Sequence, residues 1–122
     1  YNIKIATSIN GKEWKRLNKT AIDFKNRKEN ALARPCVVKF GSKYYMWFSK
    51  KGKNYRTGFA YSKDGINWKR NDSLVDLNIG KTSFDNKMIC YPYIFSFKKK
   101  IYCIYNGNNY GYSGIGMAVL KK

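Results

Sequence analysis

The chain has 122 residues, a length that suits one domain and is too short for two. Hydrophobic residues make up 43% of it and aromatic residues 17%, which excludes intrinsic disorder and favours β-sheet over a helical bundle. No apolar run approaches the ~20 residues that a membrane helix needs, so a membrane is not an expected partner.

The formal net charge of +18 predicts attraction to anionic partners, acidic glycans and nucleic acids among them. However, the 20 Lys greatly outnumber the 5 Arg, and recognition of phosphates and grooves favours Arg. The basic residues are also scattered, with short runs only at 50–51, 98–100 and 121–122. We therefore interpret the charge as solvated surface composition, and nucleic acid is the disfavoured partner.

The chain contains three cysteines, Cys36, Cys90 and Cys103, with no CxxC spacing, and it has no His. It therefore lacks the usual zinc partner and the usual base of a Ser or Cys nucleophile. No metal and no cofactor are expected. Free cysteines in apolar stretches, with no signal segment in this chain, favour a cytoplasmic location.

Internal repetition is the strongest pattern in the sequence. Residues 1–16 align with residues 55–70 at an offset of 54, with seven identities that include Tyr1/Tyr55, Gly11/Gly65 and Trp14/Trp68. Residues 35–40 align with residues 92–97 at an offset of 57. Two interlocking alignments indicate a repeated structural unit.

Read in chain order, the unit is a set of short strands separated by turns. Residues 1–17 supply strands three and four of one unit. Residues 32–70 are a complete unit, with strands at 35–40, 43–49, 55–62 and 67–70. Residues 87–120 supply strands one to three of a last unit. The Lys63-Asp64-Gly65 segment is a strong hairpin turn, because Gly adopts positive φ without strain.

Four antiparallel strands repeating at this period are typical of the blade of a β-propeller, so the predicted fold is all-β. About two and a half blades cannot close a ring of four to eight. Either the polypeptide is longer than this chain, or several copies assemble one ring. We favour truncation, and the expected structural partners are missing blades or further copies of the chain.

Four segments resemble the five-bladed β-propeller glycoside hydrolases, the relatives of arabinanases, xylosidases and invertases. They are 29–35 (ENALARP), 60–68 (AYSKDGINW), 90–93 (CYPY) and 105–108 (YNGN). The similarity spans nearly the whole chain but only the C-terminal half of such a protein. The SxDGxxW turn within 62–68 marks the architecture rather than the activity.

The resemblance implies carboxylates around the central funnel, since glycosidic chemistry needs at least two. Glu29 and Asp85 each precede strand one of a blade, on the funnel side, and are the predicted catalytic residues. Glu13 and Asp64 lie in turns between strands three and four, at the opposite end, and Asp64 is expected to cap its own hairpin. The connection between blades carries weaker candidates, Asp72 and Asp76.

Aromatic rings stack on sugar C–H faces, and amides and guanidinium groups bind hydroxyls and carboxylates. Arg34, at the start of strand one, is a candidate for a sugar contact or for an ion pair with Glu29. The other predicted substrate-binding residues lie at strand starts and in the funnel-side loop of the last blade; they are Arg56, Tyr91, Asn106, Asn108 and Tyr110. Polar residues in such loops also serve simply to turn the chain.

The chain departs from the invertase-type pattern at two positions. Arg34-Pro35 lacks the Asp of Arg-Asp-Pro, and Ile89-Cys90 replaces Glu-Cys. A full catalytic set therefore does not carry over. We expect a glycosidase-like, carbohydrate-processing protein, a glycoside hydrolase or a fragment of one, with carbohydrate as its partner. The alternatives are a non-catalytic sugar-binding propeller and, less favoured, a polyanion or nucleic-acid binder.

Overall fold

The computed structural model describes residues 1–81 and 83–121, and their regular structure consists of strands and short 3-10 helices. No helix in these two ranges is long and apolar enough to cross a membrane. The strands are β1 (Ile3–Thr7), β2 (Lys15–Ile22), β3 (Ala31–Phe40), β4 (Lys43–Lys51), β5 (Tyr55–Ser62), β6 (Trp68–Arg70), β7 (Cys90–Phe97), β8 (Lys100–Asn106) and β9 (Ile115–Val119). The 3-10 helices are η1 (Asp72–Leu74), η2 (Ser83–Asp85) and η3 (Asn109–Gly111).

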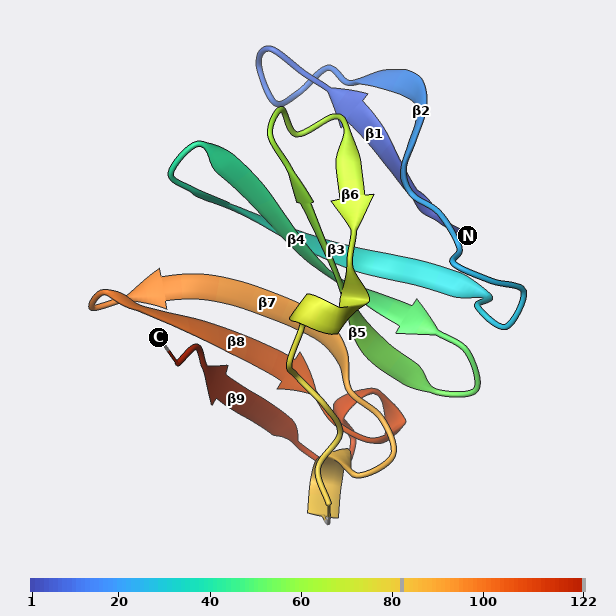
Figure 1. The fold of residues 1–122 in the computed structure, drawn as a ribbon, viewed down its shortest axis with the longest axis vertical. Helices are drawn as coiled ribbons and strands as arrows, with labels where there is room; N and C mark the ends of the chain where they lie inside the picture. The colour runs from blue at the N-terminus through green and yellow to red at the C-terminus, as the bar shows by residue number, and fades with distance from the viewer. Residues whose placement is uncertain (82, 122) are drawn as a thin grey trace.

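The strands form three antiparallel sheets in chain order, β1-β2, β3-β4-β5-β6 and β7-β8-β9. Each strand pairs with its neighbour in sequence, and the sheets follow one another from top to bottom of Figure 1. The predicted fold class is confirmed: the chain is an all-β segment of a β-propeller with one four-stranded blade between two shorter sheets. We call the end where β3 and β7 begin the funnel end; it also carries the loops at 52–54 and 107–114.

The tight turns at the opposite end are held by side chains of the repeated SxDGxxW motif. Asp64 Oδ1 accepts from the amides of Ile66 and Asn67, at 2.9 and 2.7 Å, which confirms its predicted capping role. Trp68 Nε1 donates to the Gly65 carbonyl at 2.9 Å. The β1–β2 turn has the same pattern with Asn10 in place of the Asp, and Trp14 Nε1 donates to the Gly11 carbonyl at 3.2 Å.

The main core lies between the first two sheets. Phe48 and Ala60 are fully buried, and they pack with Leu32, Met46, Ile3 and Ile22. Gly58 makes room for this core, because a Cβ there would lie 2.5 Å from two atoms of the Phe48 ring. Alternating apolar residues of β3, β4 and β5 therefore bury one face of the central blade against the first sheet.

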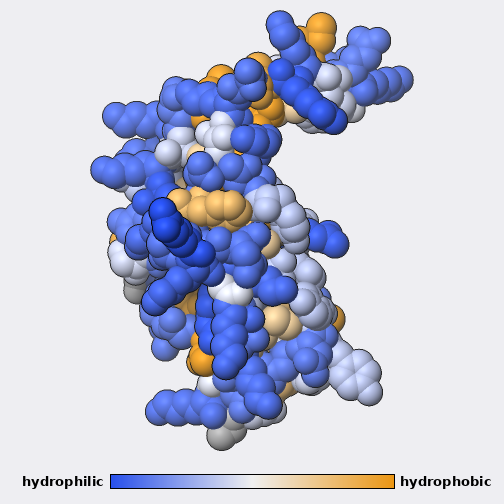
Figure 2. Space-filling model, turned by 90° about the vertical axis from the view of Figure 1, so that its right-hand side faces the viewer, coloured by the Kyte–Doolittle hydropathy of each residue, from blue (hydrophilic) through white to orange (hydrophobic). Residues whose placement is uncertain are grey.

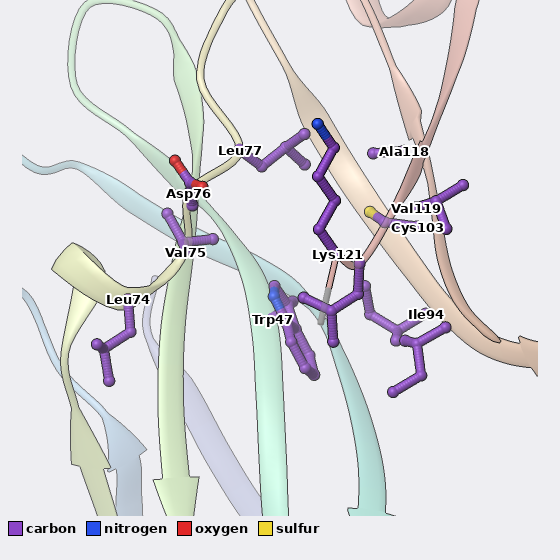
Figure 3. A pocket seen from close by; sticks show the side chains of 12 residues that line it. Trp47, Leu74, Val75, Asp76, Leu77, Ile94, Cys103, Ala118, Val119 and Lys121 are labelled. Atoms are coloured by element: carbon purple, nitrogen blue, oxygen red, sulfur yellow. The ribbon is translucent and has the colours of Figure 1, made fainter. Parts of the chain in front are cut away.

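The other face of the central blade packs against the last sheet through β3 and β7. We call these two strands, the first of each sheet, the inner strands. The Ile94 amide of β7 donates to Cys36 Sγ of β3 at 3.2 Å. An apolar groove of about 370 Å³ lies beside this contact, and Trp47, Leu77 and Ala118 are among its lining residues (Figure 3). The two blades thus meet through aliphatic and aromatic side chains.

The outer face of the last sheet is apolar and exposed. The pairing register places Tyr93, Ile104 and Met117 in one row across the three strands. Phe95, Tyr102 and Val119 form the next row. Tyr93 and Met117 are 62% and 63% exposed, and no described residue covers them. Apolar rows of this kind are typical of a sheet face that packs against another layer.

An ion-pair network joins the funnel-side loop at 23–30 to the central blade. Arg70 Nη2 lies 2.5 Å from Glu29 Oε1 and 2.7 Å from Asp72 Oδ2. Lys50 Nζ lies 2.9 Å from the same oxygen of Asp72. The Arg70 guanidinium also lies over the Phe48 ring, 5.2 Å from its centroid. We call these four charged residues, Glu29, Lys50, Arg70 and Asp72, the Arg70 network.

The variant Asp72→Asn tests how much the Arg70 network stabilises the fold. It removes the carboxylate that Arg70 and Lys50 share, and we expect the free energy of unfolding to fall by roughly 3 kcal/mol. Denaturant titration at neutral pH measures the change. The matched control Glu13→Gln alters an exposed carboxylate in the β1–β2 turn and should stay within about 0.5 kcal/mol.

The same pair of variants predicts a pH dependence. Burial raises the pKa of Asp72, but hydrogen bonds from Arg70 and Lys50 outweigh it and lower the pKa to about 2, below the ordinary value of 3.8. Because the folded pKa is the lower one, the stabilisation is complete above about pH 4 and is lost as the pH falls toward 2. Asp72→Asn should shrink this acid-induced loss. An unchanged acid limb would contradict the assignment.

Candidate functional site

The candidate site begins with a β-bulge in each inner strand. The register shifts between Ala33 and Cys36 in β3, and between Cys90 and Tyr93 in β7. Arg34 and Tyr91 occupy the bulges, each directly before a proline, with φ of 52° and 56°. A positive φ in a bulky residue costs of order 1–3 kcal/mol, and such strain clusters at functional sites. A bulge also redirects the side chain that it carries.

The Tyr91 bulge is held by a buried hydroxyl on the neighbouring blade. Ser49 of β4 is fully buried, and its Oγ accepts from the Tyr91 amide at 2.7 Å. The bulge interrupts the β7–β8 ladder at this amide, and Ser49 replaces the missing ladder partner. The central blade therefore sets the position of Tyr91 in the last sheet.

The two bulges bring four tyrosines and an arginine together at the funnel end. The Arg34 guanidinium lies over the Tyr91 ring, 5.2 Å from its centroid. Tyr91 and Tyr110 are stacked, with centroids 6.3 Å apart, and both contact Tyr55 at about 6 Å. The Tyr1 hydroxyl lies 3.3 Å from the Tyr55 hydroxyl. We call these five residues the tyrosine–arginine cluster.

Burial differs sharply within the tyrosine–arginine cluster. Tyr55 is only 4% exposed and forms its base, whereas Tyr110 is 52% exposed. A hydrogen bond with Tyr1, followed by burial, raises the pKa of Tyr55 well above its ordinary value. Burial likewise raises the pKa of Tyr91. Both phenols therefore keep their protons at neutral pH and can act as hydrogen-bond donors.

The loop that carries Tyr110 is fixed by two of the predicted substrate-binding amides. Asn106 Nδ2 donates to the Tyr110 carbonyl at 2.9 Å. Asn108 Oδ1 accepts from the amides of Lys87 and Met88, both at 2.9 Å. These contacts use the amides to shape the loop, and they help to hold Tyr110 at a φ of 58°.

Arg56 and Glu29 lie on a different part of the funnel end. They line a cavity of about 350 Å³ together with Lys28 and Lys53. Arg56 Nη1 donates to the carbonyls of Tyr55 and Lys87, both at 2.8 Å, and so connects the central blade to the loop before β7. Of the eight predicted site residues, Arg34, Tyr91 and Tyr110 thus form one group, and Arg56 and Glu29 another.

The Glu29 side chain is largely occupied within the Arg70 network. Arg70 Nη1 and Nη2 donate to its two carboxylate oxygens at 2.8 and 2.5 Å. Burial raises the pKa of Glu29, but the hydrogen bond from Arg70 and one from the Lys25 amide lower it overall. Of the two open expectations for Arg34, the structure shows no ion pair with Glu29, because Arg70 already holds that carboxylate.

Asp85 lies inside the last blade. It is 8% exposed, and its Oδ2 accepts from the Tyr105 hydroxyl at 2.8 Å. Burial and this hydrogen bond raise the pKa of Tyr105 to about 12. A Cβ at Gly80 would come within 2.1 Å of the carboxylate, so the surrounding chain is tightly closed. Asp85 is not among the residues that line the cavity beside Glu29.

Sequence reasoning missed two members of the tyrosine–arginine cluster, Tyr1 and Tyr55. Tyr1 and Tyr55 occupy equivalent positions of the repeat, but the repeat alone does not indicate that either belongs to a binding site. The available signal was their position at or just before the start of strand three, beside the funnel-side loops. For metals, residues 1–81 and 83–121 contain no group of three His, Cys, Asp or Glu side chains that could hold an ion.

No family model matches the chain. Two curated proteins of Mycobacterium tuberculosis are each 34% identical to it over 119 residues: the uncharacterized protein MT1551 of strain CDC 1551 / Oshkosh and the uncharacterized protein Rv1502 of strain ATCC 25618 / H37Rv. Each alignment covers 98% of the chain, and the chain spans 40% of the length of these relatives.

Solved structures give the fold. A glycoside hydrolase and a BT0996 RGII complex each match with a TM-score of 0.78 and 23% identity, over 99% of the chain and 36% of theirs. Zg3597, a family 117 glycoside hydrolase from Zobellia galactanivorans, matches with a TM-score of 0.60 and 18% identity over 84% of the chain and 38% of its own. The chain thus shares a propeller fold with glycoside hydrolases.

The variant Ser49→Ala tests the support of the Tyr91 bulge. It leaves the partly buried Tyr91 amide without its acceptor, and we expect the free energy of unfolding to fall by about 1–3 kcal/mol. Hydrogen exchange at the Tyr91 amide should also accelerate.

Thr57 offers a matched control, because it pairs with Ser49 across β4 and β5. Its buried Oγ1 has no hydrogen-bond partner among the described residues. Thr57→Val should therefore be neutral or stabilising in the same denaturant titration. If Ser49→Ala costs no more than Thr57→Val, the hydroxyl does not support the bulge.

Proposed function

We propose that the tyrosine–arginine cluster binds carbohydrate at the funnel end of a glycosidase-like propeller. The proposal rests mainly on one observation: Tyr91 and Tyr110 both contact the buried Tyr55, and the Arg34 guanidinium lies over the Tyr91 ring. Two of these side chains sit on strained bulges. Strain of this kind persists only where the surrounding structure enforces it, and it is common in ligand-binding sites.

The chemistry of the cluster suits a sugar. The exposed parts of Tyr91 and Tyr110 offer flat apolar faces to sugar C–H groups, and their hydroxyls are donors and acceptors. The Arg34 guanidinium adds a planar set of donors that matches paired oxygens. The likeness in fold to proteins named as glycoside hydrolases supports a carbohydrate ligand.

The proposal includes a complete ring around the site. The apolar rows on the outer face of the last sheet, with Tyr93 and Met117 exposed, supply a surface for another blade. Further blades of a longer polypeptide or further copies of this chain would cover it. The relatives, of which the chain spans 40%, favour the longer polypeptide. Light scattering of the 122-residue chain distinguishes a defined ring of copies from other states.

The variant Tyr91→Ala tests carbohydrate binding at the cluster. Loss of one ring contact is worth about 1 kcal/mol, so the affinity for a bound glycan should fall about fivefold or more. A glycan array at moderate salt identifies the ligand, and calorimetry measures the change.

Tyr112→Ala is the matched control, since Tyr112 lies in the same loop two residues after Tyr110, is 91% exposed and is not part of the tyrosine–arginine cluster. It should leave the affinity unchanged. An array without any hit, or equal losses in the two variants, would contradict the proposal.

Glycoside hydrolysis is the second candidate function, and the position of Glu29 favours it. Glu29 lines the cavity of about 350 Å³, and its lowered pKa keeps it ionised at neutral pH, as a base or nucleophile requires. Asp85 is the second carboxylate on the funnel-side connections. Both residues already have structural partners, Arg70 and Tyr105, which favours the binding function over the catalytic one.

The variants Glu29→Gln and Asp85→Asn in the protein test hydrolysis. Each should lower kcat for a cleaved glycoside by at least about a hundredfold, as expected when an acid or base is removed. Glu13→Gln, far from the funnel end, should leave kcat unchanged. Because Glu29→Gln also weakens the Arg70 network, unfolding is measured in parallel. If both variants keep full turnover of every cleaved glycoside, these carboxylates are not catalytic.

A further inference from the structure

We propose that the carbohydrate bound at the funnel end carries an anionic group, a carboxylate, sulfate or phosphate ester. The inference rests on the proposed carbohydrate-binding function and adds the substrate class. It starts from the charges that surround the tyrosine–arginine cluster rather than from the net charge of the chain.

Two cations lie directly on the rings of the cluster. The Arg34 guanidinium is 5.2 Å from the Tyr91 centroid, and Lys51 Nζ is 5.4 Å from the Tyr55 centroid. The two rings are 5.9 Å apart, so both cations lie within reach of one short oligosaccharide. Neither side chain donates a hydrogen bond to an acceptor in residues 1–81 and 83–121. Their donors are therefore available to a ligand.

The neighbouring cavity adds to the positive charge. Lys28, Lys53 and Arg56 line it, and Lys28 and Lys53 are exposed. Lys50 also reaches this cavity, but its charge is matched by Asp72 at 2.9 Å. The cations beside the cluster therefore outnumber the carboxylates that face them. Figure 2 looks at this end of the molecule, where hydrophilic side chains cover most of the surface.

The carboxylates of the chain do not neutralise these cations. Glu29 is held by Arg70, and Asp85 faces Tyr105 in the last blade. Asp23 accepts from Asn2 and from the Phe24 amide. Glu13 and Asp64 lie in turns at the opposite end, and Asp76 lines the apolar groove beside Trp47. An anionic ligand would thus meet unpaired cations, and hydrogen bonds to charged groups are about twice as strong as neutral ones.

A glycan fits these observations better than a nucleic acid. At the funnel end, the cations without a carboxylate partner lie around one aromatic cluster and one cavity, whereas a nucleic-acid surface follows a strand over many phosphates. The cluster also lies on inner-strand bulges of a fold shared with glycoside hydrolases. Tighter binding of a nucleic acid than of every glycan would therefore overturn the proposal.

The test compares matched ligands on the protein by calorimetry. The probes are an oligogalacturonate, its neutral methyl ester, a sulfated and a phosphorylated oligosaccharide of similar length, and a single-stranded DNA oligonucleotide. We expect at least one anionic glycan to bind about tenfold or more tightly than its neutral counterpart, with the ratio falling at high salt. The carboxylate, sulfate and phosphate arms identify the anionic group.

Variants test which residues cause the preference for anionic over neutral glycans. Lys51→Gln should reduce the ratio of anionic to neutral affinity toward one, while binding of the neutral glycan changes little. Arg34→Gln should also lower this ratio, because the anionic glycan loses more affinity than the neutral one. Arg16→Gln and Lys63→Gln remove exposed charges away from the funnel end and should keep the ratio. Circular dichroism verifies folding. If a variant fails to fold, the ratio measured on the unaltered protein still decides the proposal.

The outcomes distinguish the anionic substrate class from carbohydrate binding itself. Equal binding of anionic and neutral glycans overturns the anionic substrate class and leaves carbohydrate binding intact. Binding of no glycan at all rejects both. Tighter binding of DNA than of every glycan, with a steep salt dependence, also overturns the proposal and identifies a polyanion binder. A ratio that Arg16→Gln lowers as much as Arg34→Gln would refute the cluster as its source.

Discussion

The placement of the candidate site depends on the strained residue before proline in each inner strand. Proline has no amide hydrogen, so a ladder bond is lost where Pro35 and Pro92 enter the sheets. Each strand has a β-bulge at this point, and the residue directly before the proline adopts a positive φ. In a regular strand Arg34 and Tyr91 would follow the alternation of their sheets. The bulge turns them instead toward the funnel end, where they meet each other.

This arrangement makes the site a property of two blades rather than one. Arg34 comes from the central blade, whereas Tyr91 comes from the last sheet. Ser49 of the central blade accepts a hydrogen bond from the Tyr91 amide.

The Arg70 network is separate from this site and is mainly structural, since it attaches the loop before β3 to β4, β6 and η1. Glu29 lies at the border between these two systems. A carboxylate that an arginine already holds with two hydrogen bonds can act on a substrate only if that pairing weakens, and this conflict favours binding over hydrolysis.

Much of the fold could be predicted from the sequence, because repeats report backbone geometry directly. The paired prolines and the SxDGxxW turns located the inner strands and the far-end hairpins, including the cap at Asp64. The site could be predicted only in part. Arg34 lies close to Glu29 along the chain, which suggested a pair, yet Arg70 reaches Glu29 from β6 through the sheet. The role of Tyr55 was missed, because its contacts come from residues distant in sequence, and no local pattern reports them.

The internal repeat also indicates what the outer face of the last sheet packs against. The offset of 57 makes Tyr45 equivalent to Tyr102 and Trp47 equivalent to Ile104. In the central blade, Trp47 belongs to the face that meets the next blade, beside Ile94 and Ala118 (Figure 3). In the last sheet, the equivalent residues form the exposed apolar rows.

A head-to-tail copy of this chain would bring the first sheet to this apolar face. The outward residues of the first sheet include Lys4 and Arg16, which are exposed and charged. Packing an apolar face against a cationic one gives little stabilisation, because the cations lose hydration without gaining a partner. A further blade with an aliphatic face would instead bury the apolar rows. The surface chemistry therefore favours a further blade of different sequence over a repeated copy of this chain.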